Sequence, residues 1–480
     1  MSIKNPYVQY MYSYPHKTAY RPLSGVNLED YGDRFAGEDH SLYVHIPFCE
    51  SKCGYCNLFS VTGLGQEEMK RYLDAAERQI GRYARILDRA GAVFSDLTVG
   101  GGTPLLLEEK LLERVFDMSE KYMKFTERPV RIIETAPNQT SGEKMALLKE
   151  RGVTRVSMGI QSFQEQELYA LGRKHGGAQA RKALDLVKSF GFPCVNVDFI
   201  YGIPGQTADS LLESLREAVS FEPHEIFLYP LYVKHGAGLM KAVREGMVLD
   251  PDRTFALYRE ASGYLRAEGY RQDSMRRFVR RRQKDSGGKI REENREFSDC
   301  GFSASLAVGC GGRSYVGNLH FCTPYAITRQ GCLAELKAYL ECEDHTRIRH
   351  GIFLSEEEQK RRYVIRHILI LPGLDEKRYR DRFGTGVLED FPLLVRWMEE
   401  GFLKERELSA DTQRSEKDSG RTEVRERTEG PWLTLTEEGL GLSDYLGPQL
   451  ISPDIRRRME EWDCDHGESS GSLPGKFKKL

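Results

Sequence analysis

Three cysteines lie within eight residues, Cys49, Cys53 and Cys56, directly after the apolar run from Leu42 to Phe48. Cysteine thiolates are the preferred protein ligands of iron-sulfur clusters, and three of them at this spacing can hold three corners of a cubic cluster. The fourth iron then has no protein ligand and can bind the amine and carboxylate of a small molecule. The spacing therefore favours a catalytic cluster over a simple electron carrier.

A zinc site and a disulfide pair are the alternatives for these cysteines. Structural zinc usually takes four ligands arranged as two close pairs, and no second Cys-x2-Cys or His pair lies nearby in the sequence. The chain has 10 cysteines without the regular spacing of a disulfide framework, which fits a reducing compartment. We therefore predict an iron-sulfur site, and we expect most of the remaining cysteines to be buried or idle thiols.

Composition argues against two classes of partner. The chain of 480 residues has 70 basic and 72 acidic side chains, and this balance does not suit a nucleic-acid-binding surface. No apolar run reaches the length of a membrane span, and residues 1–23 lack the apolar core of a signal peptide. We expect a cytoplasmic protein with no membrane and no nucleic-acid partner, and the length suggests two folded units plus connectors.

From residue 41 to about residue 235, short β-rich runs alternate with amphipathic helical stretches. Six such units predict an α/β fold with a parallel sheet and helices outside, in the form of an incomplete barrel, because each crossover returns the next strand beside the last. The expected strands are Leu42–Ile46, Phe94–Val99, Val130–Thr135, Thr154–Met158, Cys194–Ile200 and Glu225–Leu231. The expected helices are Gln66–Leu87, Glu108–Tyr122, Gly142–Lys149, Gln179–Ser189 and Ala208–Val219.

Polar residues and glycines gather at the ends of these expected strands, the edge where parallel barrels build their active sites. The turn Gly100–Pro104 follows the second strand, and its three glycines allow a ligand to approach the backbone closely. Glu134, Gln161 and Asp198 each lie at the end of an apolar strand and can hydrogen-bond a nucleoside-like ligand. Taken singly, the turn is equally consistent with a simple tight turn, and each polar side chain with a satisfied residue at a strand end.

The pattern loosens after residue 250. We expect an N-terminal arm at 1–40, a core barrel at 41–250, a barrel extension with substrate-side loops at 251–325, and a mainly helical C-terminal domain at 326–463. A charged insertion at 280–299 and a disordered insertion at 405–430 interrupt these units, and residues 464–480 form a flexible tail. The helices expected in this part are Arg253–Ala267, Glu335–Tyr339, Glu356–Leu371, Val387–Glu400 and Thr436–Leu446.

Four ordered motifs resemble the radical S-adenosylmethionine (SAM) superfamily, in the branch related to oxygen-independent coproporphyrinogen III oxidase and its heme-chaperone relatives. These motifs are residues 42–59, which include the cysteines, and residues 100–104, 155–163 and 196–207. The likeness is dense over residues 41–235 and thin afterwards. It implies a partial (β/α)6 barrel of the radical SAM type with a smaller, mainly helical C-terminal domain.

The resemblance also implies cofactors and ligands. Cys49, Cys53 and Cys56 would hold a [4Fe-4S] cluster, and the methionine moiety of SAM would chelate its open iron. The residues implied around one SAM molecule, or two, are Tyr43, Tyr55, Gly101, Gly102, Thr103, Glu134, Gln161, Arg173 and Asp198. An electron from a low-potential donor such as flavodoxin or ferredoxin would cleave SAM reductively to methionine and a 5′-deoxyadenosyl radical, which abstracts hydrogen from an inert carbon.

Two positions depart from the patterns of that branch. The oxidase carries a fourth cysteine two positions after the third, where this chain has Leu58, and the chaperones usually carry an aromatic residue there, whereas here Phe59 comes one position later. Three functions stay open: an oxidoreductase like coproporphyrinogen III oxidase acting on a tetrapyrrole or another small molecule, a C-methyltransferase that uses two SAM molecules, and a heme chaperone or heme-binding protein. The first is the leading hypothesis.

Three features outside these motifs are less specific. The tyrosine-rich N-terminal segment can cap the barrel or pack on its outside. A thiol at Cys310 lies in a glycine-rich run that we expect to close over the site, where an inert role is the simpler interpretation. A cluster of five arginines can bind substrate carboxylates or can be a solvated charge run. These arginines are Arg276, Arg277, Arg280, Arg281 and Arg282.

Overall fold

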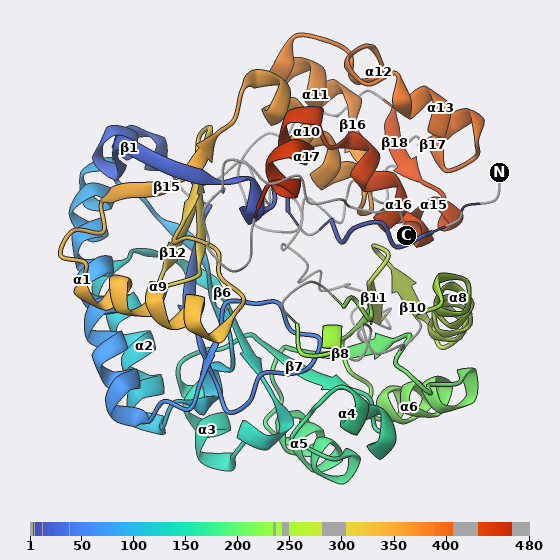
Figure 1. The fold of residues 1–480 in the computed structure, drawn as a ribbon, viewed down its shortest axis with the longest axis horizontal. Coiled ribbons are helices and arrows are strands. Elements are labelled where there is room, and N and C mark those ends of the chain that lie inside the picture. Colours follow the sequence, from blue (N-terminus) through green and yellow to red (C-terminus); the bar gives the residue numbers. More distant parts are fainter. Residues whose placement is uncertain are drawn as a thin grey trace.

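The computed structural model describes residues 3, 5–11, 13–37, 39–233, 237–241, 249–280, 304–406 and 431–462. A long curved sheet with helices on its outer face is closed on its open side by a smaller unit, drawn in orange and red in Figure 1. None of the helices that the structure describes combines the length and the apolar character that a membrane span requires. Nearly all of the predicted insertions at 280–299 and 405–430, and the whole tail at 464–480, lie outside the described residues.

Six parallel strands form the centre of the sheet, in the order β2-β5-β6-β7-β8-β9. Their bounds are β2 His40–Ile46, β5 Phe94–Gly101, β6 Phe125–Thr135, β7 Arg155–Gln161, β8 Cys194–Tyr201 and β9 Glu225–Pro230. Each strand overlaps the run expected from the sequence, so the predicted partial (β/α)6 barrel is confirmed. The parallel pairing brings all six carboxyl ends to one edge, which we call the mouth of the barrel.

Helices connect these strands and cover the outer face of the sheet (Figure 1). Their bounds are α1 Gln66–Ala90, α2 Glu109–Tyr122, α3 Gly142–Glu150, α4 Glu165–Ala170, α5 Gly177–Ser189, α6 Ala208–Ser220 and α8 Pro251–Ala267. Helix α1 buries Leu73, Ile80 and Leu87 in the main core, and Gly91 ends it in the left-handed conformation at φ 68°. The short helix α4 was not among the helices expected from the sequence.

The sheet continues beyond the six strands on both sides. Next to β2 come β12 Ser305–Val308, β13 Arg313–Val316, β14 Leu319–Cys322, β15 Arg347–Phe353 and β1 Arg21–Asn27, and next to β9 come β11 Arg277–Arg280 and β10 Tyr270–Gln272. Strand β1 comes from the expected arm, and β15 comes from the expected C-terminal domain. Helix α9, Arg329–Glu341, also belongs to the main unit, because Leu336 and Tyr339 are buried in its core. The main unit therefore draws on residues outside 41–325.

The smaller unit has a core of its own around Trp397, Tyr379 and Leu433, all fully buried. Its elements are α10 Glu356–Ile368, α11 Glu376–Phe383, α12 Val387–Asp390, α13 Leu393–Glu399, α15 Glu437–Gly441, α16 Ser443–Leu446 and α17 Pro453–Glu460, with the small sheet β16 Leu374–Asp375, β18 Trp432–Leu435 and β17 Leu403–Arg406. The helix expected at 387–400 is broken at Pro392, which cannot donate a helical hydrogen bond. The expected smaller, mainly helical C-terminal unit is confirmed.

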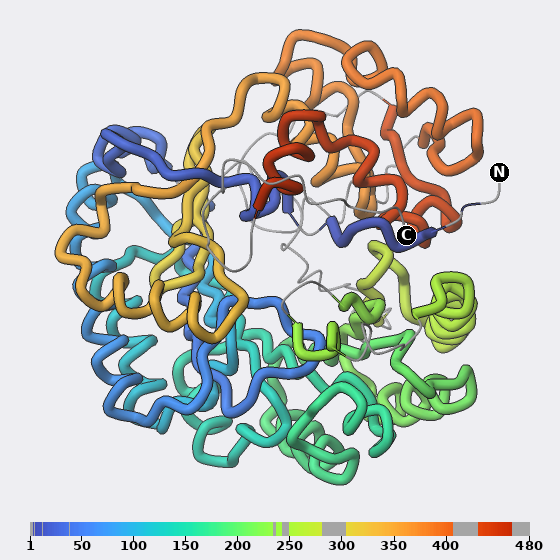
Figure 2. Tube along the Cα trace, in the orientation of Figure 1, coloured from blue at the N-terminus to red at the C-terminus, as the bar shows by residue number. Residues whose placement is uncertain are grey.

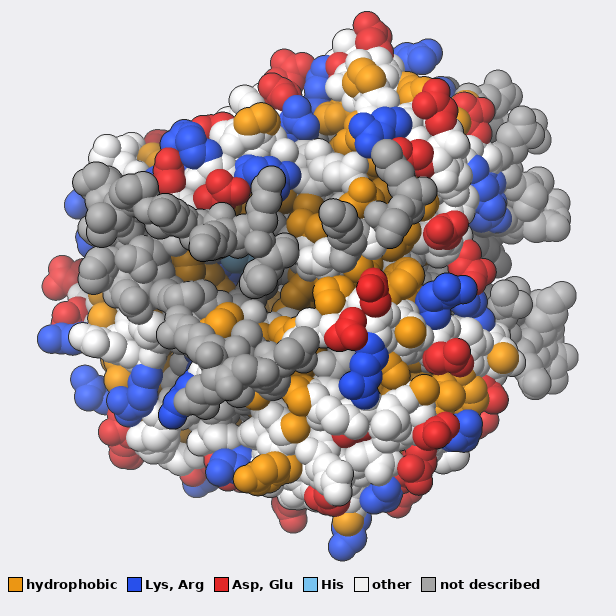
Figure 3. Space-filling model, turned by 45° about the vertical axis from the view of Figure 1, so that its right-hand side comes forward, with side chains coloured by type: hydrophobic (Ala, Val, Ile, Leu, Met, Phe, Trp, Pro, Cys, Tyr) orange, Lys and Arg blue, Asp and Glu red, His pale blue; other side chains and the backbone are white. Residues whose placement is uncertain are grey.

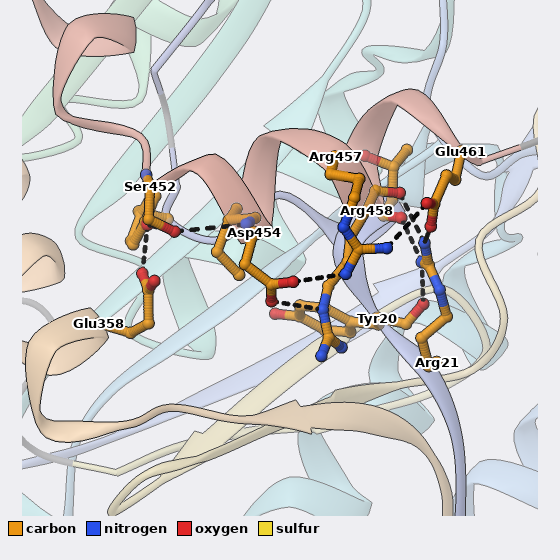
Figure 4. A network of polar contacts seen from close by, with 11 residues as sticks. Tyr20, Arg21, Glu358, Ser452, Asp454, Arg457, Arg458 and Glu461 are labelled. Carbon is orange, nitrogen blue, oxygen red and sulfur yellow. Dashed lines mark hydrogen bonds and ion pairs between the residues drawn. The ribbon is translucent and has the colours of Figure 1, made fainter.

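The N-terminal residues lie between the sheet and the smaller unit rather than on the outside (Figure 2). Tyr14 and Tyr20 are almost completely buried, and the Tyr14 hydroxyl donates a hydrogen bond to Glu358 of α10. Figure 4 shows a second attachment, where the Arg21 guanidinium donates to the Arg458 carbonyl oxygen at 2.7 Å. These residues are therefore fixed to the C-terminal unit at several points.

The remaining short elements are β3 Phe48–Cys49, β4 Val61–Thr62 and the 3-10 helices η1 Lys17–Ala19, η2 Leu28–Phe35, η3 Pro104–Leu106, η4 Pro137–Gln139 and η6 Gly447–Leu450.

The separate core of the smaller unit leads to a stability prediction. Replacing Trp397, which is 0 % exposed, with alanine leaves a large cavity and should lower the free energy of unfolding of this unit by about 3–5 kcal/mol. The matched control is Val395→Ala on the same helix, where the side chain is 40 % exposed and the expected loss is below about 0.5 kcal/mol. Urea unfolding, followed by far-UV circular dichroism so that the signal does not depend on the deleted tryptophan, measures the stability of both variants. Equal losses of unfolding free energy in the two variants would contradict the assigned core.

Candidate functional site

The three cysteines stand on the loop that follows β2 at the mouth of the barrel. Cys49 ends the short strand β3, and the Cys56 amide donates to the Cys53 carbonyl oxygen at 3.0 Å, which closes a turn around the second and third cysteines. The Gly54 amide donates to the Leu171 carbonyl oxygen at 3.0 Å and holds this turn against the segment after α4. All three thiols are half-buried.

The glycine turn after β5 packs directly on the cysteine loop. The Gly102 amide donates to the Ile46 carbonyl oxygen at 2.8 Å, and the Thr103 amide donates to the Phe48 carbonyl oxygen at 2.7 Å. The Thr103 hydroxyl lies 3.8 Å from the Cys49 sulfur. A Cβ at Gly102 would lie 2.5 Å from the Phe48 oxygen and 2.9 Å from the Cys49 sulfur, so this approach of backbone to thiol requires glycine.

Arg173 connects the second cysteine to strand β7. Its Nη1 donates to the Cys53 sulfur at 3.2 Å, and its Nη2 donates to the Gly159 carbonyl oxygen at 2.6 Å. Gln161, two residues after Gly159 in the sequence, has a φ of 72°, which is uncommon for a residue with a side chain. A Cβ at Gly159 would lie only 2.7 Å from the Gln161 amide nitrogen, so the Gln161 side chain folds back over β7, beside the arginine.

Two carboxyl groups occupy the inner side of the mouth. Glu134 accepts a hydrogen bond from the Gly101 amide at 3.0 Å, and Asp198 accepts one from the Asn196 amide nitrogen at 2.8 Å. Burial raises the pKa of Glu134. Burial also raises the pKa of Asp198 to about 7, the Asn196 hydrogen bond opposes the rise, and the negative charge of Glu134 adds to it. Asp198 can therefore both donate and accept hydrogen bonds near neutral pH.

His45 is a site residue that we did not assign from the sequence. Its Nε2 lies 3.1 Å from the Phe59 carbonyl oxygen and must donate to it, so its Nδ1 accepts from the Tyr43 hydroxyl at 3.2 Å. Burial and the positive charge of Lys17 lower the pKa of His45 to about 3, which keeps the ring neutral. The signal was available in the sequence, because this histidine stands in the strand just before the cysteines.

Tyr55 lies on the cysteine loop itself. Its side chain packs on the apolar cluster that contains Leu171 and Ile203. Burial raises the pKa of Tyr55 above its usual value, and the positive charge of Arg173 opposes the rise. The phenol therefore stays neutral beside the cysteines.

The structure brings the implied residues together, in the carboxyl halves of the central strands or in the segments that follow them. They are Tyr43, Cys49, Cys53, Tyr55, Cys56, Gly101, Gly102, Thr103, Glu134, Gln161, Arg173 and Asp198. The contacts above join most of them into one continuous set, from Cys53 through Arg173 to β7 and from Cys49 through the glycine turn to Glu134. Their binding roles stay predictions.

Arg276 and Arg277 do not belong to a solvated charge run, because both side chains are buried in ion pairs. Arg276 pairs with Asp444 and Arg277 with Glu225 and Asp273, whereas Arg280 pairs with Glu222 at the surface. Arg277 is only 2 % exposed. Arg281 and Arg282 lie outside the described residues.

The glycine-rich turn between β12 and β13 lies beside the carboxyl end of β2. Cys310 is fully buried there, and its amide donates to the Tyr72 hydroxyl at 3.0 Å. A Cβ at Gly309 would lie 2.6 Å from the His45 carbonyl oxygen. The turn therefore supports the end of the strand that carries His45. The expectation that this run closes over the site stays a prediction.

Three thiols on one loop suit an iron-sulfur cluster, whose preferred protein ligands are cysteine thiolates. Among the described residues, no group of three or more His, Cys, Asp or Glu side chains is placed to hold one ion. A cubic cluster needs no such convergence, because each thiolate binds a different iron. Burial raises the pKa of Cys49 to about 11, so cluster binding has to release protons from the thiols.

Gly102 provides a test of the contact between the glycine turn and the cysteine loop. In Gly102→Ala the new methyl group meets backbone at 2.5 Å, so the loop must shift and the iron and sulfide bound per chain after anaerobic reconstitution should fall at least about threefold. Gly142→Ala is the matched control, because nothing lies within 4 Å of its Cβ position. Iron content equal in the two variants and the wild type would contradict this role of the turn.

The raised pKa of Asp198, about 7, predicts a pH-dependent stability of the cluster-free protein. Between pH 4 and pH 7 the folded chain keeps a proton that the unfolded chain has lost, so this carboxyl makes unfolding easier as the pH rises. Asp198→Asn keeps the oxygen that Asn196 bonds and removes the charge. Because solvent reaches part of the mouth, we expect the free energy of unfolding at pH 8 to rise by about 1–3 kcal/mol, with a smaller gain near pH 5.

Urea unfolding at both pH values measures this difference between the variant and the wild type. Asp185→Asn, on the exposed face of α5, serves as the control and should change stability by less than about 0.5 kcal/mol. A loss of stability in Asp198→Asn at pH 8 would show that the ionised carboxylate is stabilised in its site.

Comparison with known proteins agrees with this geometry. The family described as the radical SAM superfamily matches residues 43–218. A heme chaperone, HemW, of Bacillus subtilis is 26 % identical over 361 residues, which cover 74 % of this chain and 90 % of that protein. The oxygen-independent coproporphyrinogen III oxidase of Escherichia coli is 26 % identical over 414 residues, 82 % of this chain and 88 % of that protein.

The fold has a counterpart among solved structures. Coproporphyrinogen III oxidase (HemN) from Escherichia coli, described as a radical SAM enzyme, superimposes with a TM-score of 0.73 at 21 % identity, covering 92 % of this chain and 96 % of that one. Because the match covers 92 % of this chain, the shared fold includes most of the smaller unit as well as the barrel. The chain thus carries a radical SAM domain at residues 43–218, and along most of its length it is similar to proteins named coproporphyrinogen III oxidase and heme chaperone.

Proposed function

We propose that this chain is a radical SAM enzyme in which Cys49, Cys53 and Cys56 hold a [4Fe-4S] cluster and the mouth of the barrel binds SAM. With SAM on its open iron, such a cluster supplies the electron that cleaves the sulfonium C–S bond and yields a 5′-deoxyadenosyl radical. The observation that carries the proposal is the continuous set of contacts that joins the cysteine loop, the glycine turn and the polar strand ends at one mouth.

The residues of the chain have distinct tasks in this proposal. The guanidinium of Arg173 donates to the Cys53 sulfur and places a positive charge beside this cluster ligand. The turn at Gly101 and Gly102 offers bare backbone to the amino group of SAM. Glu134 and Asp198 orient the rest of the cofactor through hydrogen bonds, so their removal should cost positioning more than electron transfer.

Water has to be excluded from such a site, because a reactive radical needs a closed cavity. The arm and the smaller unit lie over the open side of the barrel. In Figure 3 apolar side chains gather near the centre of this face of the molecule. Apolar side chains beside a polar cofactor site suit a large, mostly apolar substrate.

For the substrate we propose a tetrapyrrole, with oxidation of a porphyrinogen as the first activity to test. The support is the relative named coproporphyrinogen III oxidase, whose fold is shared over 92 % of this chain. Heme binding without turnover is the second candidate. It is favoured by Leu58, which stands where the oxidase pattern has a cysteine, and by the Bacillus subtilis relative named heme chaperone.

Anaerobic reconstitution followed by product analysis separates these functions. A reduced enzyme should form 5′-deoxyadenosine and methionine, and the yield should rise with coproporphyrinogen III if the oxidase function holds. Stoichiometric heme binding in a spectral titration, without any tetrapyrrole turnover, would favour the chaperone function. S-adenosylhomocysteine beside 5′-deoxyadenosine would indicate radical methylation. A protein that binds no iron, or never cleaves SAM, would end the proposal of a radical SAM enzyme.

The cluster ligands can be tested one at a time. Cys53→Ala removes the thiol that Arg173 contacts, and we expect it to abolish both the bound cluster and the formation of 5′-deoxyadenosine. Cys342→Ala, at the end of α9 and far along the chain from the loop, is the control and should keep both. Iron and sulfide analysis with product chromatography gives the two readouts. Full activity in Cys53→Ala would refute the assignment of Cys53 as a cluster ligand.

A further inference from the structure

A fully buried aspartate joins three separate parts of the chain. Asp444 of α16 is 0 % exposed, and its Oδ2 accepts hydrogen bonds from the Tyr232 hydroxyl at 2.5 Å and from the Arg276 guanidinium. The Asp444 carbonyl oxygen accepts from the Gln9 amide at 3.2 Å. Tyr232 follows β9, Arg276 precedes β11 and Gln9 belongs to the N-terminal arm, so one residue of the smaller unit holds both the barrel and the arm.

The same residues fix the ring of Tyr10 in the arm. The Arg276 guanidinium lies 3.8 Å from the centre of this ring, a close cation–π contact. The ring of Tyr232 stacks on the ring of Tyr10, with 6.5 Å between the ring centres and 7° between the ring planes. We call Tyr10, Tyr232, Arg276 and Asp444 the arm clamp. Because Asp444 orients both Arg276 and Tyr232, it determines where the Tyr10 ring can lie.

The clamp reaches the cofactor side of the mouth through Tyr229. The Tyr10 ring meets the Tyr229 ring edge-on, with 6.1 Å between centres. In the β8–β9 pairing Tyr229 lies opposite Ile200, which is two residues after Asp198 and therefore on the same face of the sheet. Burial raises the pKa of Tyr229, and the negative charge of Asp198 contributes to the rise. The Tyr229 phenol therefore lies close to the Asp198 carboxyl group.

We propose that Asp444 is a positioning residue, which holds Tyr10 against Tyr229 and so shapes the wall of the mouth beside Asp198. Its effect on SAM rests on the proposed function, whereas the clamp itself does not. Asp444 lies in the smaller unit, yet it acts on the wall of the barrel through the ring of Tyr10 and its contact with Tyr229.

The first test is Asp444→Asn in the full chain. An amide keeps the shape but leaves the Arg276 guanidinium without its counter-charge, so the Tyr10 ring loses its fixed place. In the cluster-free protein, amide hydrogen exchange of residues 5–11 should become at least about tenfold faster. In dithionite-driven SAM cleavage by the reconstituted protein, the KM for SAM should rise about tenfold, while kcat and iron per chain stay within about twofold.

A second variant covers the case in which the buried asparagine prevents folding. Tyr10→Ala removes only the ring of the arm and should raise the KM for SAM by a similar factor. The double variant should show no further rise, because both substitutions remove the same contact. Asp454→Asn is the matched control, since Asp454 lies in the same unit and pairs with the surface residues Arg457 and Arg458 (Figure 4). It should change neither readout.

Two results would overturn the proposal. If exchange in the arm becomes faster but the KM for SAM stays unchanged in both variants, Asp444 has a structural role only. If exchange in the arm does not change in Asp444→Asn, the clamp does not hold the arm. A wild-type protein that cleaves no SAM would refute the proposed function instead, and the exchange measurement would still decide whether the clamp exists.

Discussion

The close packing of a bare backbone turn on the cysteine loop is the contact on which the rest of the site depends. Gly102 lies so near Phe48 and Cys49 that a single methyl group would overlap both. The two amides after β5 donate to carbonyl oxygens of the β2 end and of the cysteine loop. The same turn bonds Glu134 through the Gly101 amide. The close approach of these two backbone segments therefore sets the positions of a thiol, a turn without side chains and a carboxyl group.

This contact is possible because the strands are parallel and in register. Ile46 at the end of β2 lies opposite Gly101 at the end of β5, so the loop after one strand begins where the turn after the next begins. The same pairing continues through β6, β7 and β8. Parallel pairing is therefore the reason why residues more than a hundred positions apart, such as Cys53 and Arg173, touch at one mouth.

The central barrel and the residues of the mouth can be predicted from the sequence because their signals are local. Each strand is a short apolar run, and each polar residue stands at its end, so topology alone brings Glu134 and Asp198 together. The arginine run at Arg276 could not be interpreted in the same way. Its partner Asp444 lies 168 residues away in the sequence, and nothing near either residue marks the pair. Burial turned an apparent surface charge run into an internal ion pair.

The limits of the units could not be predicted for a related reason. Strands β1 and β15 pair with each other although they lie far apart in the sequence, at Arg21–Asn27 and Arg347–Phe353, and their pairing is visible only after folding. A buried residue such as Ile348 joins the main core because its strand extends the sheet, and its apolar character alone does not say which core it enters. Sequence periodicity gives the element, whereas the partner is chosen by tertiary packing.

The two carboxyl groups at the mouth of the barrel lie in surroundings that disfavour their charged forms. Glu134 and Asp198 are both held in surroundings that raise their pKa values, the latter to about 7, so ionising either of them works against folding. The positive charge of Arg155 opposes this effect at both carboxyl groups, but Arg155 is also paired with Glu225 at 2.7 Å. Among the residues that the structure describes, the charges of these two carboxyl groups are thus only partly balanced. In the function proposed above, the sulfonium group of SAM would supply positive charge beside them, which is a physical reason for that cofactor to bind at this mouth.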